Sequence, residues 1–200
     1  KISLNPIINS FQEVVNKFKI DHSLIESFLD SMEMDLEEQH YDDNTYKKYI
    51  LGSAEVVGLM CLTIFVNGDQ NQFNKLKPYA MKLGSAFQKI NFLRDVNDDY
   101  NKLGRTYFPD VNIANFKNTD KVKIENEIEK EFTEGLKGIK MLPNKAKGGV
   151  YLAYKYYYNL FRKIKRIPAN QILAKRTRIS NFHKFIILIS SMTKYHAKQI

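Results

Sequence analysis

Apolar residues recur at the spacing of a helix along nearly the whole chain, and short turn signals separate the segments that carry them. Clusters of isoleucine and tyrosine follow the helical period, and no run alternates in the way that a half-buried strand does. Asn5 and Asp21 are typical helix caps, and Asn67-Gly68-Asp69 is typical of a turn. The pattern predicts an all-α protein with helices at residues 6–18, 22–36, 45–66, 73–101, 121–140, 143–167 and 181–198.

Two of these helices have compositions that bear on packing. Residues 121–140 alternate Lys with Glu, which we interpret as a solvated face without chemistry. In residues 45–66, Gly52 and Gly58 lie inside the predicted helix, where a glycine costs roughly 1 kcal/mol. They indicate close approach by another helix or by a ligand, and helix packing alone would explain them. Cys61, in an apolar run of the same helix, is predicted to be a small buried hydrophobe.

The chain is organised around the stretch GSAFQKINFLRDVNDDYNKLGRTYFP, at residues 84–109. Within it, one set of residues steps by four, three, four and four positions, so its members share one face of one helix. The members of this polar row are Gly84, Gln88, Asn91, Asp95 and Asp99. A polar face that is buried or that lines a cleft costs free energy unless something pairs with it.

The polar row has the chemistry of a site for a hard cation. Asp95 and Asp99 lie one turn apart with Asp98 beside them, and Mg2+ takes one or two protein carboxylates together with water and phosphate oxygens. Arg105, just past the predicted helix, could then meet the anionic end of a substrate. The alternative is a solvated acidic face followed by a turn. The two amides of the row favour the first interpretation, because a solvated face more often carries Lys or Glu there.

The same stretch resembles a known motif. QxxNxxRDxxxD at residues 88–99, followed by GRxYFP at residues 104–109, is similar to the second aspartate-rich motif of the squalene/phytoene synthase family. The resemblance implies a class I isoprenoid (terpenoid) synthase fold, an all-α helical bundle around a central cavity. It makes Asp95 and Asp99 catalytic metal ligands, and it assigns substrate binding to residues Gln88, Asn91 and Arg105.

The resemblance extends to three other segments. The helix that holds Tyr49 and Ser53 is similar to the family helix that lines the prenyl-chain tunnel, which makes these two residues substrate-binding. Tyr156 fits the family's substrate-facing, catalytic tyrosine, whose ring face can stabilise a developing carbocation. The basic segment KRTRIS places Arg178 where a diphosphate could be met, and the two basic residues that open the segment are weaker candidates.

In two respects the sequence departs from the family pattern. The first aspartate motif, a D-x-x-x-D on a facing helix, is missing, and Glu26 and Asp30 have helical spacing but the wrong neighbours. Most acidic residues of the helix predicted at residues 22–36 are expected to face solvent. Asp30 and Asp35 are the candidates among them for contact with the site. The interval from Asp99 to Arg105 is one residue longer than the commonest family spacing, which would displace Arg105.

The length and the missing motif together predict one domain at residues 1–200, which is expected to be N-terminally incomplete and to correspond to the C-terminal two-thirds of a synthase. As given, it is expected to be catalytically incomplete. The single cysteine suits a reducing compartment, and we expect a cytoplasmic location. Contact with a membrane stays open because prenyl substrates and products are apolar.

The charge is unevenly placed along the chain. Residues 141–200 hold thirteen Lys or Arg and no Asp or Glu, whereas residues 1–140 hold eighteen basic and twenty-two acidic residues. A basic last third indicates an anionic partner, for which a diphosphate, an acidic lipid and a nucleic acid all qualify. A nucleic-acid-binding protein would leave the polar row unexplained, so we expect no nucleic-acid partner.

The favoured function is the Mg2+-dependent head-to-head condensation of two prenyl diphosphates, with geranylgeranyl diphosphate as the favoured substrate and Mn2+ as a substitute metal. The product would be phytoene, formed through a cyclopropyl diphosphate. The alternative within the family is a squalene or dehydrosqualene synthase that uses farnesyl diphosphate, and NADPH would be needed only to form squalene. A non-catalytic helical homologue is the alternative of another class.

Overall fold

The computed structural model describes residues 2–36, 41–109, 111–174 and 176–197, which form helices and no strand, as predicted. Two 3-10 turns and one π-helical segment, η2, interrupt the α-helices. In chain order the elements are α1 (Pro6–Phe18), α2 (His22–Glu33), η1 (Met34–Leu36), α3 (Asp43–Ile50), η2 (Leu51–Glu55), α4 (Val56–Phe65), α5 (Gln70–Leu103), η3 (Ile113–Asn115), α6 (Asn118–Met141), α7 (Asn144–Lys165), α8 (Ala169–Ile172) and α9 (Asn181–His196).

Local signals fix most of the helix ends. The side chains of Asn5, Asp21 and Asp69 accept hydrogen bonds from backbone N–H groups in the first turns of α1, α2 and α5. Gly104, with a φ of 66°, closes α5 in the left-handed conformation that glycine adopts freely. The helix predicted at residues 73–101 begins earlier, at Gln70, and Pro78 lies inside it.

The helix predicted at residues 45–66 is a continuous run of α3, η2 and α4. Its π-helical part contains Gly52, which packs so closely against Ser27 and Ser31 of α2 that a Cβ there would overlap them. The whole run, Asp43–Phe65, is also long and apolar enough to cross a membrane, a test that core helices pass as well. The sequence pattern does not predict the short helix α8, which begins directly after Pro168.

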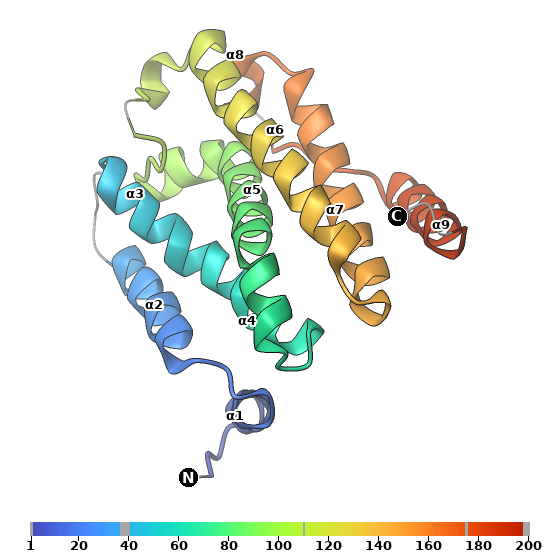
Figure 1. The fold of residues 1–200 in the computed structure, drawn as a ribbon. Coiled ribbons are helices and arrows are strands. Elements are labelled where there is room, and N and C mark those ends of the chain that lie inside the picture. Colours follow the sequence, from blue (N-terminus) through green and yellow to red (C-terminus); the bar gives the residue numbers. More distant parts are fainter. Residues whose placement is uncertain (1, 37–40, 110, 175, 198–200) are drawn as a thin grey trace.

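Helix α5 is the centre of the bundle. It contacts α4 and η2 on one side and α6 and α7 on the other, an arrangement that Figure 1 shows with α5 in green. The side chains of Ile90 and Leu93 on α5, Phe132 on α6 and Phe161 on α7 are almost completely buried in the main core. Burial of such side chains stabilises a fold by roughly 1.5–3 kcal/mol each.

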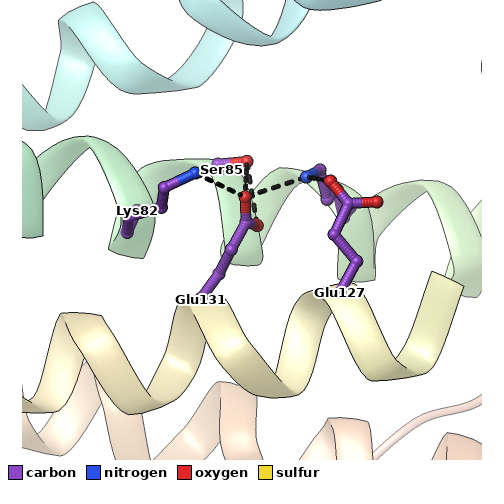
Figure 2. A network of polar contacts seen from close by, with 5 residues as sticks. Lys82, Ser85, Glu127 and Glu131 are labelled. Carbon is purple, nitrogen blue, oxygen red and sulfur yellow. Dashed lines mark hydrogen bonds and ion pairs between the residues drawn. The ribbon is translucent and has the colours of Figure 1, made fainter.

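A buried network of charges also joins α5 to α6 (Figure 2). Glu131 of α6, whose side chain is 6% exposed, accepts hydrogen bonds from Ser85 Oγ at 2.9 Å and from Lys89 Nζ at 2.9 Å. Lys82 and Glu127 complete the network from its ends. The interpretation of residues 121–140 as a solvated face is therefore wrong for Glu131, because the alternation of Lys with Glu does not reveal which pairs lie between two helices.

Helix α9 packs on α7 with Ile187 buried between them, and Figure 1 shows it at the edge of the bundle. The apolar row that the sequence places on this helix faces solvent instead of a core. The exposed residues are Phe182, Phe185, Ile186, Ile189 and Met192.

Candidate active site

An apolar groove of about 590 Å3 lies beside α5, a volume typical of pockets that bind small molecules. Residues of η2, α4, α5, α6 and α7 line it, and many of them are glycine, alanine or leucine. Gly84 brings α5 close to η2, because a Cβ on Gly84 would lie 2.6 Å from the carbonyl oxygen of Ala54. Cys61 lines the groove and is exposed, so its prediction as a buried residue is wrong.

One end of the groove is polar. Ser53, Gln88 and Ala153 are the last lining residues of η2, α5 and α7 at this end. Beyond them, Asn91 Nδ2 donates to Gln88 Oε1 at 3.3 Å, and the hydroxyl of Tyr157 donates to Asn91 Oδ1 at 3.4 Å. The polar row therefore begins in the wall of the groove and continues along α5 away from it, as its helical spacing requires.

Asp95 is the most heavily paired residue of the polar row. Arg94 binds its carboxylate through Nη2 at 2.6 Å and Nε at 3.0 Å. Arg176, from the segment between α8 and α9, reaches the same carboxylate through Nε at 2.6 Å. Two guanidinium groups thus converge on Asp95, and charges of both signs gather along α5 beyond the polar end of the groove.

Asp99 lies in a different environment. Burial and, to a smaller extent, repulsion from Asp95 raise the pKa of its carboxyl to about 6, while Arg105 acts in the opposite direction. Among the residues that the structure describes, no ion pair involves this carboxylate. A carboxylate that is desolvated and crowded by like charge gains more than an exposed one from a bound cation.

Asp35 of η1 gathers two of the predicted substrate-binding residues. The hydroxyl of Tyr49 donates to Asp35 Oδ2 at 3.0 Å, and Nη1 of Arg105 lies 3.4 Å from Asp35 Oδ1. Arg105 also donates from Nη2 to the backbone carbonyl of Asp35. Tyr49 in turn packs against Tyr107, whose ring stacks on Phe92 at a centroid distance of 4.0 Å.

Two predicted site residues lie apart from this cluster. Tyr156 does not line the groove, and its ring faces Lys184 of α9 with Nζ 5.8 Å from the centroid. Tyr157 is the tyrosine of α7 that contacts the polar row. Arg178 is exposed, and the contact recorded for it is made by its carbonyl group, which accepts from Lys163 Nζ at 2.6 Å.

Sequence reasoning gave too little weight to Arg94, Arg176 and Tyr157. Arg94 belongs to the QxxNxxRDxxxD motif at residues 88–99, and its position next to Asp95 is the sequence signal for their ion pair. Arg176 was one of the two weaker candidates of the basic segment, and nothing local distinguishes it from Arg178. The ring of Tyr157 stacks on that of Phe87 of α5 at a centroid distance of 4.1 Å, a contact that no sequence pattern predicts.

The donor set fits Mg2+ in part. Asp95 and Asp99 supply two carboxylates on one helix face, and Mg2+ accepts a site of one or two carboxylates completed by water and phosphate oxygens. Within residues 2–36, 41–109, 111–174 and 176–197, no group of three or more His, Cys, Asp or Glu side chains could hold a metal ion. Asp95 and Asp99 would therefore hold the ion from one side, and Arg94 and Arg176 would have to share the Asp95 carboxylate with it or release it.

Comparison with known proteins identifies the family and the fold. The family model described as squalene/phytoene synthase matches residues 1–183. The chain belongs to the squalene/phytoene synthase family. Its fold is that of a class I isoprenoid synthase: a dehydrosqualene synthase in complex with ligand superimposes with a TM-score of 0.76 at 20% identity, over 98% of this chain and 73% of that chain.

Two relatives illustrate the range of the family. A 4,4'-diapophytoene synthase of Staphylococcus haemolyticus (strain JCSC1435) is 29% identical over 129 residues, which are 62% of this chain and 41% of the relative. The chloroplastic phytoene synthase 1 of Solanum lycopersicum is 28% identical over 198 residues, which are 90% of this chain and 47% of the relative. The chain thus spans about half the length of the curated relatives it matches.

Proposed function

We propose that this chain is the part of a head-to-head prenyltransferase that holds the prenyl chain and one diphosphate. The reaction joins two prenyl diphosphates, with geranylgeranyl diphosphate favoured, to phytoene through a cyclopropyl diphosphate. The observation that carries the proposal is an apolar groove that ends at the polar row of α5, where guanidinium groups and carboxylates gather. Such a site fits a ligand that is apolar along its length and anionic at one end.

Each part of the site has a role in this reaction. The apolar walls hold the prenyl chain and exclude water, which would otherwise react with a carbocation. Arg94, Arg105 and Arg176 supply positive charge to the diphosphate, and Asp95 and Asp99 would hold Mg2+ beside it. Bound Mg2+ supplies Lewis-acid stabilisation of the departing diphosphate.

The hydrogen-bonded group of Gln88, Asn91 and Tyr157 lies between the groove and the carboxylates, where the reacting carbon atoms would be. Its amides and hydroxyl are neutral, so they can orient a diphosphate oxygen or a water without trapping a cation. Tyr156 stays a proposed contact of the intermediate, which would require Lys184 to leave the face of its ring.

A dehydrosqualene synthase that uses farnesyl diphosphate is the second candidate, and the likeness to 4,4'-diapophytoene synthase favours it. Reduction to squalene would add a requirement for NADPH. We further propose a cytoplasmic protein with peripheral membrane contact, because the exposed apolar row of α9 belongs to a segment of the sequence without acidic residues.

Cys61 offers a direct test, because it lines the groove and is the one cysteine of this sequence. Its alkylation at alkaline pH should slow when geranylgeranyl thiodiphosphate, an analogue that resists ionisation, occupies the groove. Protection should require Mg2+, and Asp95→Ala should weaken it about tenfold or more. Asp30, a candidate for contact with the site by sequence, is exposed on α2 and does not line the groove, so Asp30→Ala is the matched control. Protection that is independent of Mg2+ and unchanged in Asp95→Ala would refute the proposal, and strongly salt-dependent binding of DNA would favour the nucleic-acid alternative.

A further inference from the structure

Asp35 occupies a position that the proposed reaction does not explain by itself. It lies on η1, outside the motifs at residues 88–99 and 104–109. Its carboxylate nevertheless joins Tyr49 of α3 to Arg105 of the segment after α5. Tyr49 is buried, whereas the side chains of Asp35 and Arg105 are each 25% exposed, so the cluster sits at the boundary between core and solvent. Pairs in such a place are screened less than pairs on an open surface.

The contacts of Asp35 constrain the guanidinium of Arg105 at two points. Nη1 meets the carboxylate, and Nη2 donates to the backbone carbonyl of the same residue. No hydrogen bond reaches Asp35 Oδ1 from the residues described, so the ion pair with Arg105 is what compensates this buried oxygen. A planar guanidinium that is held at two of its nitrogens has a fixed plane, and its remaining N–H groups point in fixed directions.

Arg105 lies close enough to Asp99 for its charge to lower the pKa of that carboxyl. Its backbone N–H donates to the carbonyl of Asp99 at 3.0 Å, so the two residues are neighbours at the end of α5. Without Asp35, the guanidinium would be free to turn to the Asp99 carboxylate, as Arg94 and Arg176 have turned to Asp95. An arginine paired with Asp99 would compete there with a divalent cation.

We propose that Asp35 is a positioning residue: it holds Arg105 and Tyr49, whose carbonyl accepts from Ser53 of the groove wall, so that Arg105 faces the substrate diphosphate and Asp99 stays available to the metal. This inference rests on the proposed function of the groove and adds a residue to it. A purely structural role, in which Asp35 only ties η1 to α3, differs in its consequences. It would weaken the binding of every ligand of the groove equally, whereas a positioning role concerns the diphosphate alone.

Asp35→Asn tests this distinction, because the amide oxygen can still accept from Tyr49 while the charge that holds Arg105 is removed. Two probes are compared by protection of Cys61: geranylgeranyl thiodiphosphate with Mg2+, and geranylgeraniol, which has the same chain and no diphosphate. We expect Asp35→Asn to weaken the thiodiphosphate about tenfold, as for loss of a charged hydrogen bond, and to leave the alcohol within about twofold. Asp30→Asn should change neither probe, and thermal unfolding of each variant reports whether it is folded.

A double variant sharpens the result. Arg105→Gln should weaken the thiodiphosphate by a similar factor, and Asp35→Asn combined with Arg105→Gln should be no worse than Arg105→Gln alone, because Asp35 acts through Arg105. The inference is overturned if the two substitutions multiply, if Asp35→Asn leaves the thiodiphosphate unchanged, or if both probes weaken together. Failure of the unsubstituted protein to bind the thiodiphosphate would instead overturn the proposed function, and the inference with it.

Discussion

Substitution of Glu131 should cost far more stability than its place in a helix of alternating Lys and Glu suggests. Its carboxylate accepts from Ser85 Oγ and Lys89 Nζ, and the side chains of Glu131 and Lys89 are 6% and 4% exposed. Glu131→Ala would leave the Lys89 ammonium buried with Glu127 as its remaining partner. Removal of one partner from a buried pair costs about 3–5 kcal/mol. Since Glu127 is 55% exposed and still pairs with Lys89, we expect about 3 kcal/mol.

Glu134→Ala provides the control on the same helix. Glu134 pairs with Lys137 at 2.6 Å, but the two side chains are 42% and 58% exposed. An exposed pair of this kind contributes about 0–1 kcal/mol. Urea unfolding at pH 7, followed by circular dichroism, gives the free energy of unfolding for both variants, and an unchanged m-value shows that the comparison is valid.

The reasoning is refuted if Glu131→Ala and Glu134→Ala lose the same stability within about 0.5 kcal/mol. A second result tests the cause. Replacing the pair together, as Lys89→Met with Glu131→Leu, removes both buried charges and should restore much of the stability that Glu131→Ala loses. If the double variant is as unstable as the single one, the loss comes from packing and not from an unpaired charge.

Three further predictions concern the groove and its polar end. The pKa of Asp99 is raised from 3.8 to about 6, so the native state keeps a proton that the unfolded state releases, and Asp99 destabilises the fold as pH rises from about 4 to about 6. The full shift of the pKa corresponds to about 3 kcal/mol, which we reduce to about 2 kcal/mol because the carboxyl is only half-buried and solvent screens part of the effect. Asp99→Asn should therefore be about 2 kcal/mol more stable than the unsubstituted protein at pH 8 and nearly equal to it at pH 4, by urea unfolding; the same difference at both pH values would contradict this. Gly84→Ala should lower the free energy of unfolding by about 1–3 kcal/mol, because its Cβ would lie 2.6 Å from the Ala54 carbonyl oxygen. Gly149→Ala, whose Cβ would have no atom within 4 Å, should raise the free energy of unfolding by up to about 1 kcal/mol. A gain of stability in both variants would show that α5 and η2 can separate. Gly149→Leu should fill the groove, reduce protection of Cys61 by geranylgeraniol about tenfold and leave the thermal midpoint nearly unchanged, and full protection would place the prenyl chain elsewhere.

The helices and the polar row can be predicted from local sequence patterns. Helical period, caps such as Asp21 and Asp69, and the stop at Gly104 are interactions within a few residues, so they can be read without a tertiary structure. The row from Gln88 to Asp99 is equally local, because positions three and four apart on one helix must share a face. These features also carry the resemblance to the family, whose fold the structure shares.

The contacts between side chains of different helices become visible only in the folded protein. Asp35 and Arg105 are 70 residues apart, and Arg176 lies 81 residues beyond Asp95, so neither contact leaves a periodic trace in the sequence. The choice between neighbouring tyrosines of α7 was equally open, because adjacent positions differ by about 100° around the helix and only packing fixes its rotation. In each case the pairing and the burial of a side chain depend on the helix that packs opposite it. That helix is distant in the sequence, so no local pattern identifies it.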